Sequence, residues 1–300
     1  MFVGPSPRPF PISETSAWLT AHHDTYPSIS PKNLSLTGKS VFVSGASKGI
    51  GRTTAIRFAM AGCSKIAVGA RSPLASLEND IKAAARDAGH PEPTVLAVSL
   101  DIGSEDSVKA AAAMIGEAFG QELDVLIANA GHSSDWAPVA ETNTTEWRKT
   151  IDVNVNGLYL SSHYFLPLLL KSNLKLLIAV SSIGAVNITP GASSYQVSKL
   201  AVSRFVEFVD QEYHTQGLIA LSVHPGGVKT DLGATMPEEY HIYLCDEPEL
   251  PADHMVWLAA KRREWLAGRF VLANWDVDEL EAKRDEIVEK NLLKFALRLE

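Results

Sequence analysis

Short runs of apolar residues recur along the chain and alternate with longer stretches whose apolar positions have helical spacing. The apolar runs lie at residues 41–43, 66–68, 95–98, 125–127, 176–180, 218–223 and 270–272. Runs that are apolar at every position are typical of strands buried on both faces. Strands that alternate with helices predict a doubly wound, Rossmann-type α/β fold, with about seven parallel strands flanked by helices.

The helical stretches include residues 104–119 and 194–216, and Ser104 is a favoured N-cap followed by two acidic residues. Apolar positions within residues 278–299 predict one terminal amphipathic helix. No repeat or linker divides the pattern, so we predict a single domain at 37–300 with a loop-rich insertion at about 231–252. Residues 1–36 are rich in Pro, Ser and Thr and are predicted to be an N-terminal extension.

Composition narrows the class of protein. The chain has 300 residues, of which 46% are hydrophobic and 21% charged, as in an ordinary globular protein. A net charge of -8 gives no support for a nucleic-acid or membrane partner. Prolines interrupt the start of the chain where a signal peptide needs an apolar run, so we expect a cytoplasmic location. Cys63 and Cys245 form no metal-binding motif, and we expect two buried thiols and no metal site.

A glycine-rich turn at residues 44–51 follows the first predicted strand and opens the first predicted helix. Its glycines let the backbone approach a pyrophosphate closely, and the amides at the start of the helix favour negative charge. A tight structural turn is the alternative. The candidate phosphate-binding residues are Gly45, Ser47, Lys48, Gly49, Ile50 and Gly51.

Tyr195 and Lys199 lie four residues apart in a predicted helix, and Ser182 lies thirteen residues before the tyrosine. Side chains four positions apart share one face of a helix, so the phenol and the ammonium should be neighbours. Such a pair can move a proton to or from a carbonyl oxygen. The Tyr-x-x-x-Lys spacing alone is common, and it indicates a catalytic pair only in combination with the glycine turn upstream.

These motifs, together with Asn129-Ala130-Gly131, Asn154 and Pro225-Gly226, occur in the order found in the short-chain dehydrogenase/reductase family, which the chain resembles from about residue 36 to 271. The three-residue gap between the first two glycines resembles the ordinary, non-extended subgroup. The resemblance implies the sheet order 3-2-1-4-5-6-7, an NAD or NADP cofactor, and a homodimer or homotetramer. It also implies further cofactor contacts from Asp101, Asn129, Gly131, Pro225, Val228, Thr230, Tyr195 and Lys199.

The choice of cofactor follows from charge at the end of the second strand. NAD-dependent enzymes place a carboxylate there to bind the adenosine ribose. This chain has Ala70 followed by Arg71, whose guanidinium can bind a 2′-phosphate, and Lys48 adds a second cation. We therefore predict NADP(H), with solvated surface cations as the alternative.

The resemblance assigns the chemistry to Asn154, Ser182, Tyr195 and Lys199. To act near pH 7 the phenol of Tyr195 must shift its pKa by about 3 units from about 10, and a nearby ammonium favours the phenolate. The Ser182 hydroxyl is expected to stabilise charge on the substrate oxygen. Asn154, expected on a long helix, would hold a water that relays protons to Lys199.

The predicted function is the reduction of a ketone, or the oxidation of the matching secondary alcohol, by an NADP-dependent ketoreductase. The resemblance implies that the insertion at about 231–252 is a substrate lid. Aromatic and Met residues beyond the fourth strand and in this lid suggest a small apolar or polycyclic substrate: His132, Ser133, Trp136, Met236, Tyr240, His241 and Tyr243. The chain around Ala273-Asn274-Trp275-Asp276-Val277, together with the N-terminal extension, resembles fungal family members, some of them from secondary-metabolite pathways. A catalytically silent NADP-binding sensor or scaffold, and a non-redox cyclase or dehydratase, are the alternatives.

Overall fold

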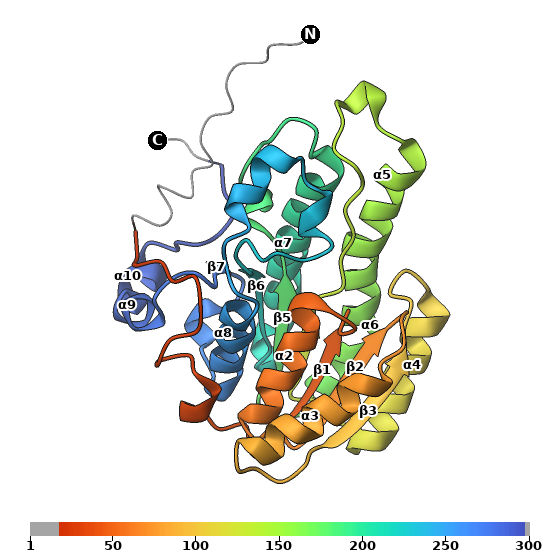
Figure 1. The fold of residues 1–300 in the computed structure, drawn as a ribbon. Helices are drawn as coiled ribbons and strands as arrows, with labels where there is room; N and C mark the ends of the chain where they lie inside the picture. The colour runs from red at the N-terminus through yellow and green to blue at the C-terminus, as the bar shows by residue number, and fades with distance from the viewer. Residues whose placement is uncertain (1–17, 298–300) are drawn as a thin grey trace.

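The computed structural model describes residues 18–297. Within them, seven strands form one parallel sheet in the order β3-β2-β1-β4-β5-β6-β7. The predicted Rossmann-type fold and strand order are therefore confirmed (Figure 1). The strands are β1 (Ser40–Ser44), β2 (Lys65–Ala70), β3 (Thr94–Ser99), β4 (Val125–Ala128), β5 (Leu176–Val180), β6 (Ile219–His224) and β7 (Phe270–Leu272).

Helices cover both faces of the sheet. One core cluster joins α2, α3 and α8 to one face, and a second joins α4, α6 and α7 to the other. The helices are α2 (Gly49–Met60), α3 (Ala75–Asp87), α4 (Glu105–Phe119), α5 (Thr144–Ile151), α6 (Gly157–Leu169), α7 (Ser193–Tyr213), α8 (Glu249–Ala260), α9 (Val277–Ala282) and α10 (Arg284–Glu289). Of the helices in residues 18–297, none is both long and apolar enough to span a bilayer.

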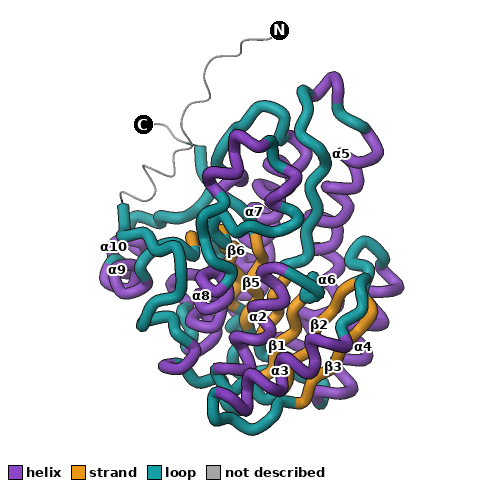
Figure 2. Tube along the Cα trace, viewed as in Figure 1, coloured by secondary structure: helices purple, strands orange, loops and turns teal. Residues whose placement is uncertain are grey.

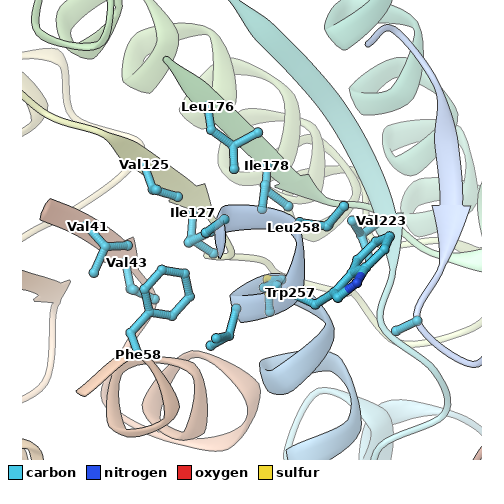
Figure 3. Close-up of a cluster of buried hydrophobic side chains, with 14 of the residues drawn as sticks. Val41, Val43, Phe58, Val125, Ile127, Leu176, Ile178, Val223, Trp257 and Leu258 are labelled. Atoms are coloured by element: carbon cyan, nitrogen blue, oxygen red, sulfur yellow. The ribbon is translucent and has the colours of Figure 1, made fainter. Parts of the chain in front are cut away.

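The first core cluster shows why the strands are apolar at every position. Figure 3 shows valine, isoleucine and leucine side chains of β1, β4, β5 and β6 facing Phe58 of α2 and Trp257 of α8. The labelled strand residues are Val41, Val43, Val125, Ile127, Leu176, Ile178 and Val223. Their neighbours in sequence, such as Phe42 and Leu126, enter the second cluster on the opposite face. Both faces of the sheet are thus excluded from solvent, so the polar side chains of a functional site lie at the ends of the strands.

Residues 18–30 pack along the C-terminal part of the domain and are loop in Figure 2. Ala21 forms an antiparallel bridge with Trp275, and the His22 amide donates to the Asn274 carbonyl at 2.7 Å. Ile29 is fully buried in the core. The first 17 residues of the predicted extension lie outside the described residues. The domain boundary at residue 37 stays a prediction, since residues 18–36 pack against the domain itself.

The prediction of one terminal helix within residues 278–299 is wrong. The chain instead forms α9 and α10, joined at Lys283, and α9 is capped by Asp276, which accepts hydrogen bonds from the amides of residues 278 and 279. After α10, Asn291 and Leu293 have positive φ angles, which end helical structure. The Leu293 carbonyl accepts a hydrogen bond from Phe270 of β7 at 2.8 Å, so contact with the sheet overrides the helical spacing.

Candidate active site

A cavity of about 700 Å³ opens at the carboxyl ends of the strands. This is where a doubly wound sheet places its ligands. Its walls come from the glycine turn, the ends of β2, β4, β5 and β6, the start of α7 and the lid. The predicted site residues that line it are Gly45, Ser47, Lys48, Gly49, Ile50, Gly51, Arg71, Asp101, Asn129, Gly131, Ser182, Tyr195, Lys199, Pro225, Val228 and Thr230. Asn154 lies outside it, in an adjoining small cavity.

The glycine turn packs directly against the end of β4. Gly45 has a φ of +68°, and a Cβ there would lie 2.8 Å from the Cα of Ala130. A Cβ on Gly51 would lie 2.5 Å from Asn129 Nδ2. The same Nδ2 donates to the Ser44 carbonyl at 2.9 Å and ties the end of β4 to the end of β1. Side chains at these glycines would clash with Asn129 and Ala130, so glycine is required for this packing. The turn lines the cavity at the start of α2, where the helix amides favour a pyrophosphate.

The end of β2 carries no carboxylate. Ala70 is its last residue, and Arg71 lies exposed on the cavity wall with no ion pair within residues 18–297. Lys48, the second predicted cation, instead forms an ion pair with Asp231, a partner that the sequence did not reveal. Arg71 is therefore the more available cation for a phosphate.

Asp101 lines the cavity beyond β3. Its Oδ1 accepts a hydrogen bond from the Gly103 amide at 3.1 Å. The cap of α4 is Ser104, as predicted, and it accepts from the Ser107 amide. Asp101 thus shapes the turn before α4 without capping the helix, and it lies on the cavity wall where a cofactor contact is predicted.

Tyr195, Ser182 and Lys199 come together on one wall of the cavity. The Lys199 ammonium lies 5.6 Å from the centre of the Tyr195 ring and donates to the Val180 carbonyl at 2.8 Å. Ser182 ends the extended chain after β5, and its Oγ accepts from the Gly184 amide at 3.0 Å. The end of β5 therefore fixes both the hydroxyl and, through its last carbonyl, the ammonium.

Burial controls the proton affinities of this group. It raises the pKa of Tyr195, and the hydrogen bond with Ser182 opposes that rise only in part. Burial also lowers the pKa of Lys199 to about 8. The pKa of Tyr195 thus moves opposite to the direction expected from a nearby ammonium. The phenol is thus protonated near neutral pH, which is the form that can donate to a carbonyl oxygen.

Asn154 lies in a π-helical turn at Asp152–Asn156, between α5 and α6, rather than within a regular helix. Its Oδ1 accepts from the His132 amide at 2.8 Å, and its Nδ2 donates to the His132 carbonyl at 2.9 Å and to Ser198 Oγ at 2.8 Å. π-helical turns are frequent at functional sites. A cavity of about 10 Å³ lined by Asn154 and Lys199 has room for about one water molecule.

His224 precedes the predicted nicotinamide loop. Its Nδ1 accepts a hydrogen bond from the Ile183 amide at 3.0 Å, and burial lowers its pKa to about 4. The neutral imidazole therefore holds the turn that carries Ser182, which agrees with a structural histidine.

The predicted substrate residues separate into two groups. Ser133, Trp136, Met236 and Tyr243 line the cavity, whereas the structure places His132, Tyr240 and His241 outside its wall. The imidazole of His132 contacts Glu146 Oε2 at 3.2 Å, and that of His241 donates to the Met236 carbonyl at 2.9 Å. The rings of Trp136 and Tyr240 lie 5.2 Å apart and join the lid to the loop after β4.

Sequence reasoning missed a further part of the wall. It comes from the N-terminal segment, the end of the lid and the chain after β7, and its residues include Ala21, His23, Cys245, Asp246, Asn274 and Trp275. Cys245 is exposed, so the prediction of two buried thiols holds for Cys63 and is wrong for Cys245. No local motif marks these residues, because they meet only when the two ends of the chain come together.

Known proteins show the same architecture. The short chain dehydrogenase mpl6 of Monascus purpureus is 47% identical over 291 residues, which span 97% of this chain and 99% of the relative. Levodione reductase superposes with a TM-score of 0.71 at 21% identity, covering 80% of this chain and 97% of that one. A 7α-hydroxysteroid dehydrogenase, complexed with NADH and 7-oxo glycochenodeoxycholic acid, gives a TM-score of 0.70 at 24% identity, covering 83% and 97%.

A family model described as short chain dehydrogenase matches residues 39–241. That range includes the glycine turn, Asn154, Ser182, Tyr195, Lys199 and the loop after β6. The chain therefore belongs to the short-chain dehydrogenase/reductase family, a family of oxidoreductases that bind a nicotinamide cofactor.

Proposed function

We propose that this protein is an NADP(H)-dependent oxidoreductase that reduces a ketone to a secondary alcohol, or catalyses the reverse oxidation, on a small apolar or polycyclic substrate. One observation carries the proposal. Tyr195, Ser182 and Lys199 share a cavity wall, and the same cavity extends to the glycine turn and Arg71. Proton-transfer groups and a phosphate site thus lie in one continuous space.

The residues of the cavity fit a nicotinamide dinucleotide. The glycine turn would hold the pyrophosphate, Asp101 the adenine, and the loop at 225–230 the nicotinamide amide. Arg71 favours a 2′-phosphate, and the absence of a carboxylate at Ala70 removes the usual repulsion. Two structural neighbours are NADH complexes at 24% identity, so the preference for NADP(H) depends on this chain's own residues.

A bound NADPH would supply a hydride to the carbonyl carbon. The Tyr195 hydroxyl donates its proton to the carbonyl oxygen, and Ser182 hydrogen-bonds that oxygen as charge develops on it. Lys199 binds the nicotinamide ribose and stabilises the phenolate that remains. A water in the small cavity lined by Asn154 and Lys199 would return the proton.

The substrate end of the cavity supports an apolar ketone. Trp136, Met236, Tyr243 and Trp275 contribute large apolar surfaces to its wall. One structural neighbour is complexed with 7-oxo glycochenodeoxycholic acid. Two relatives at 47% identity come from Monascus purpureus and Monascus ruber, which supports a role in fungal secondary metabolism.

A homodimer or homotetramer in the cytoplasm completes the proposal. Large apolar side chains are exposed on α6 and α7, where Phe208 is 59% and Tyr159 is 49% accessible. Val197 and Leu200 lie exposed on the same helix as Phe208. Such a patch is typical of a subunit interface.

The proposal is tested by following NADPH fluorescence with a panel of cyclic and polycyclic ketones. We expect oxidation of NADPH by at least one ketone. Tyr195→Phe should lower kcat by about 10²- to 10⁴-fold and change the Kd for NADPH less than about twofold, since the phenol acts on the substrate. Tyr213→Phe, at the other end of α7, is the matched control and should keep full activity.

Near-full activity of Tyr195→Phe would refute the mechanism. Tight NADPH binding without oxidation by any ketone would instead favour a silent NADP-binding sensor, or a cyclase or dehydratase on the same scaffold.

A further inference from the structure

Asp246 lies where the lid, the loop after β6 and the chain after β7 meet. The residue is buried, and its side chain is 5% accessible. Oδ2 accepts hydrogen bonds from the Gly227 amide at 2.6 Å and from Asn274 Nδ2 at 3.1 Å. The backbone amide of Asp246 donates to the Gly227 carbonyl at 2.9 Å. Both polar groups of Gly227 are therefore held by this one residue.

The loop after β6 is built around this carboxylate. Gly226 has a φ of +91°, and a Cβ there would lie 2.5 Å from Asp246 Oδ2. A Cβ on Gly227 would overlap the Tyr243 carbonyl oxygen. Glycine is thus required at both positions, because the end of the lid packs directly on the loop backbone. The position of the loop depends on where Asp246 is held.

His23 contacts the other oxygen of this carboxylate. Its Nδ1 lies 2.5 Å from Asp246 Oδ1, and its backbone carbonyl accepts from the Glu247 amide at 2.8 Å. The preceding residue, His22, accepts from Asn274 Nδ2 at 3.0 Å through its carbonyl. His23 belongs to the N-terminal segment, which lies outside the matched range 39–241, yet it lines the cavity.

We propose that Asp246 is a positioning residue for the nicotinamide end of the cofactor and that His23 holds Asp246 in place. The N-terminal segment at residues 18–30 is then part of the active site. The proposal rests on the proposed cofactor site. Asp246 acts through the Gly226–Gly227 backbone, so its loss frees the loop beside the nicotinamide and leaves the glycine turn and Arg71 unchanged.

The test compares two probes that share the adenine half. NADPH contains the nicotinamide, whereas 2′-phospho-ADP-ribose lacks it. Asp246→Ala should weaken NADPH binding about tenfold, the loss expected for one hydrogen bond to a charged group. It should also lower kcat, while the Kd for 2′-phospho-ADP-ribose stays within about twofold. Asp246→Asn should restore NADPH binding, because an amide oxygen still accepts from Gly227 and its NH₂ can donate to His23.

The N-terminal partner is tested in the same way. His23→Ala should weaken NADPH binding about threefold and leave the binding of 2′-phospho-ADP-ribose unchanged, since it removes one of several contacts to Asp246. His23→Asn should recover binding, because its amide reaches the position of Nδ1. Glu247→Ala is the matched control, since Glu247 adjoins Asp246 and contacts His23 through its backbone amide. It should behave as wild type.

Equal weakening of both probes by Asp246→Ala, or no weakening of either, would overturn the proposal. Activity lost with EDTA and restored by Zn²⁺ would also overturn it, because the ligand atoms of His23, Cys245 and Asp246 lie within 4.8 Å and would then hold a metal. A wild-type protein that binds neither NADPH nor NADH refutes the proposed function itself, and this inference with it.

Discussion

Replacing Arg71 by alanine should weaken NADPH binding about tenfold and leave NADH binding unchanged. Arg71 is exposed on the cavity wall and has no ion pair in the described part of the chain. A hydrogen bond to a charged group contributes about 1.5–3 kcal/mol, and exposure to solvent and salt favours the lower end. Because about 1.4 kcal/mol is a factor of ten in Kd, the expected loss is about tenfold.

Lys48→Ala should have a smaller effect. Lys48 is paired with Asp231, and both side chains are exposed, at 69% and 75%. A phosphate contact from Lys48 must replace this pair, which is itself weak at about 0–1 kcal/mol. The expected loss of NADPH affinity is less than about fivefold. Asp231→Ala should strengthen NADPH binding, because it releases Lys48 and removes a negative charge near the phosphate.

The assay is a fluorescence titration of each variant with NADPH and with NADH at low and high salt. The difference between Arg71→Ala and wild type should shrink at high salt, since an exposed ion pair is screened. Equal weakening of NADPH and NADH by Arg71→Ala would refute the assignment of the 2′-phosphate. So would a larger loss from Lys48→Ala than from Arg71→Ala, since the pair with Asp231 would then be irrelevant.

Three further outcomes are expected. Burial lowers the pKa of Lys199 from 10.5 to about 8, so folding is penalised below pH 8 and the penalty fades as pH rises toward 10.5. Lys199→Met should therefore lose activity but gain stability. After subtraction of the lost hydrogen bond to Val180, its free energy of unfolding, measured with urea, should rise by about 2 kcal/mol at pH 7 and by less at pH 10. No gain at either pH would contradict this. Gly45→Ala should abolish NADPH binding, whereas Gly89→Ala, at a φ of +81° with nothing within 4 Å, should change only stability by calorimetry. Phe208→Glu should shift the assembly toward monomer by light scattering, and an unchanged mass would remove α7 from the interface.

The strands were predictable because their signal is local. Residues 176–180 and 270–272 were predicted as strands, and the structure has β5 and β7 at those positions. Apolar residues at successive positions require burial on both faces, and only a parallel sheet between helix layers provides that. The terminal helix was predicted wrongly because contacts with distant parts of the chain decide its structure. Its apolar residues meet β7 and the core through turns at Asn291 and Leu293, a contact that spacing alone cannot distinguish from a helix face.

For the site, the sequence predicted which residues are involved but not the direction of their pKa shifts. The residues of the glycine turn, with Tyr195 and Lys199, were identified from short motifs, and the structure brings them to one cavity. The proton affinities could not be read from spacing. The pKa of Tyr195 is raised because the fold buries the phenol, the opposite of the direction expected from the nearby ammonium.

The sequence by itself determined the sheet, the glycine turn and the Tyr-x-x-x-Lys pair, because each is set by residues close together in the chain. Only the tertiary structure decided which distant residues complete the cavity. His23 and Asp246 are separated by 223 positions but lie in contact. The N-terminal segment reaches Asp246 because it pairs with the chain after β7, at the edge of the sheet beside the cavity. Such a contact depends on strand order and packing, which no local pattern of side chains records.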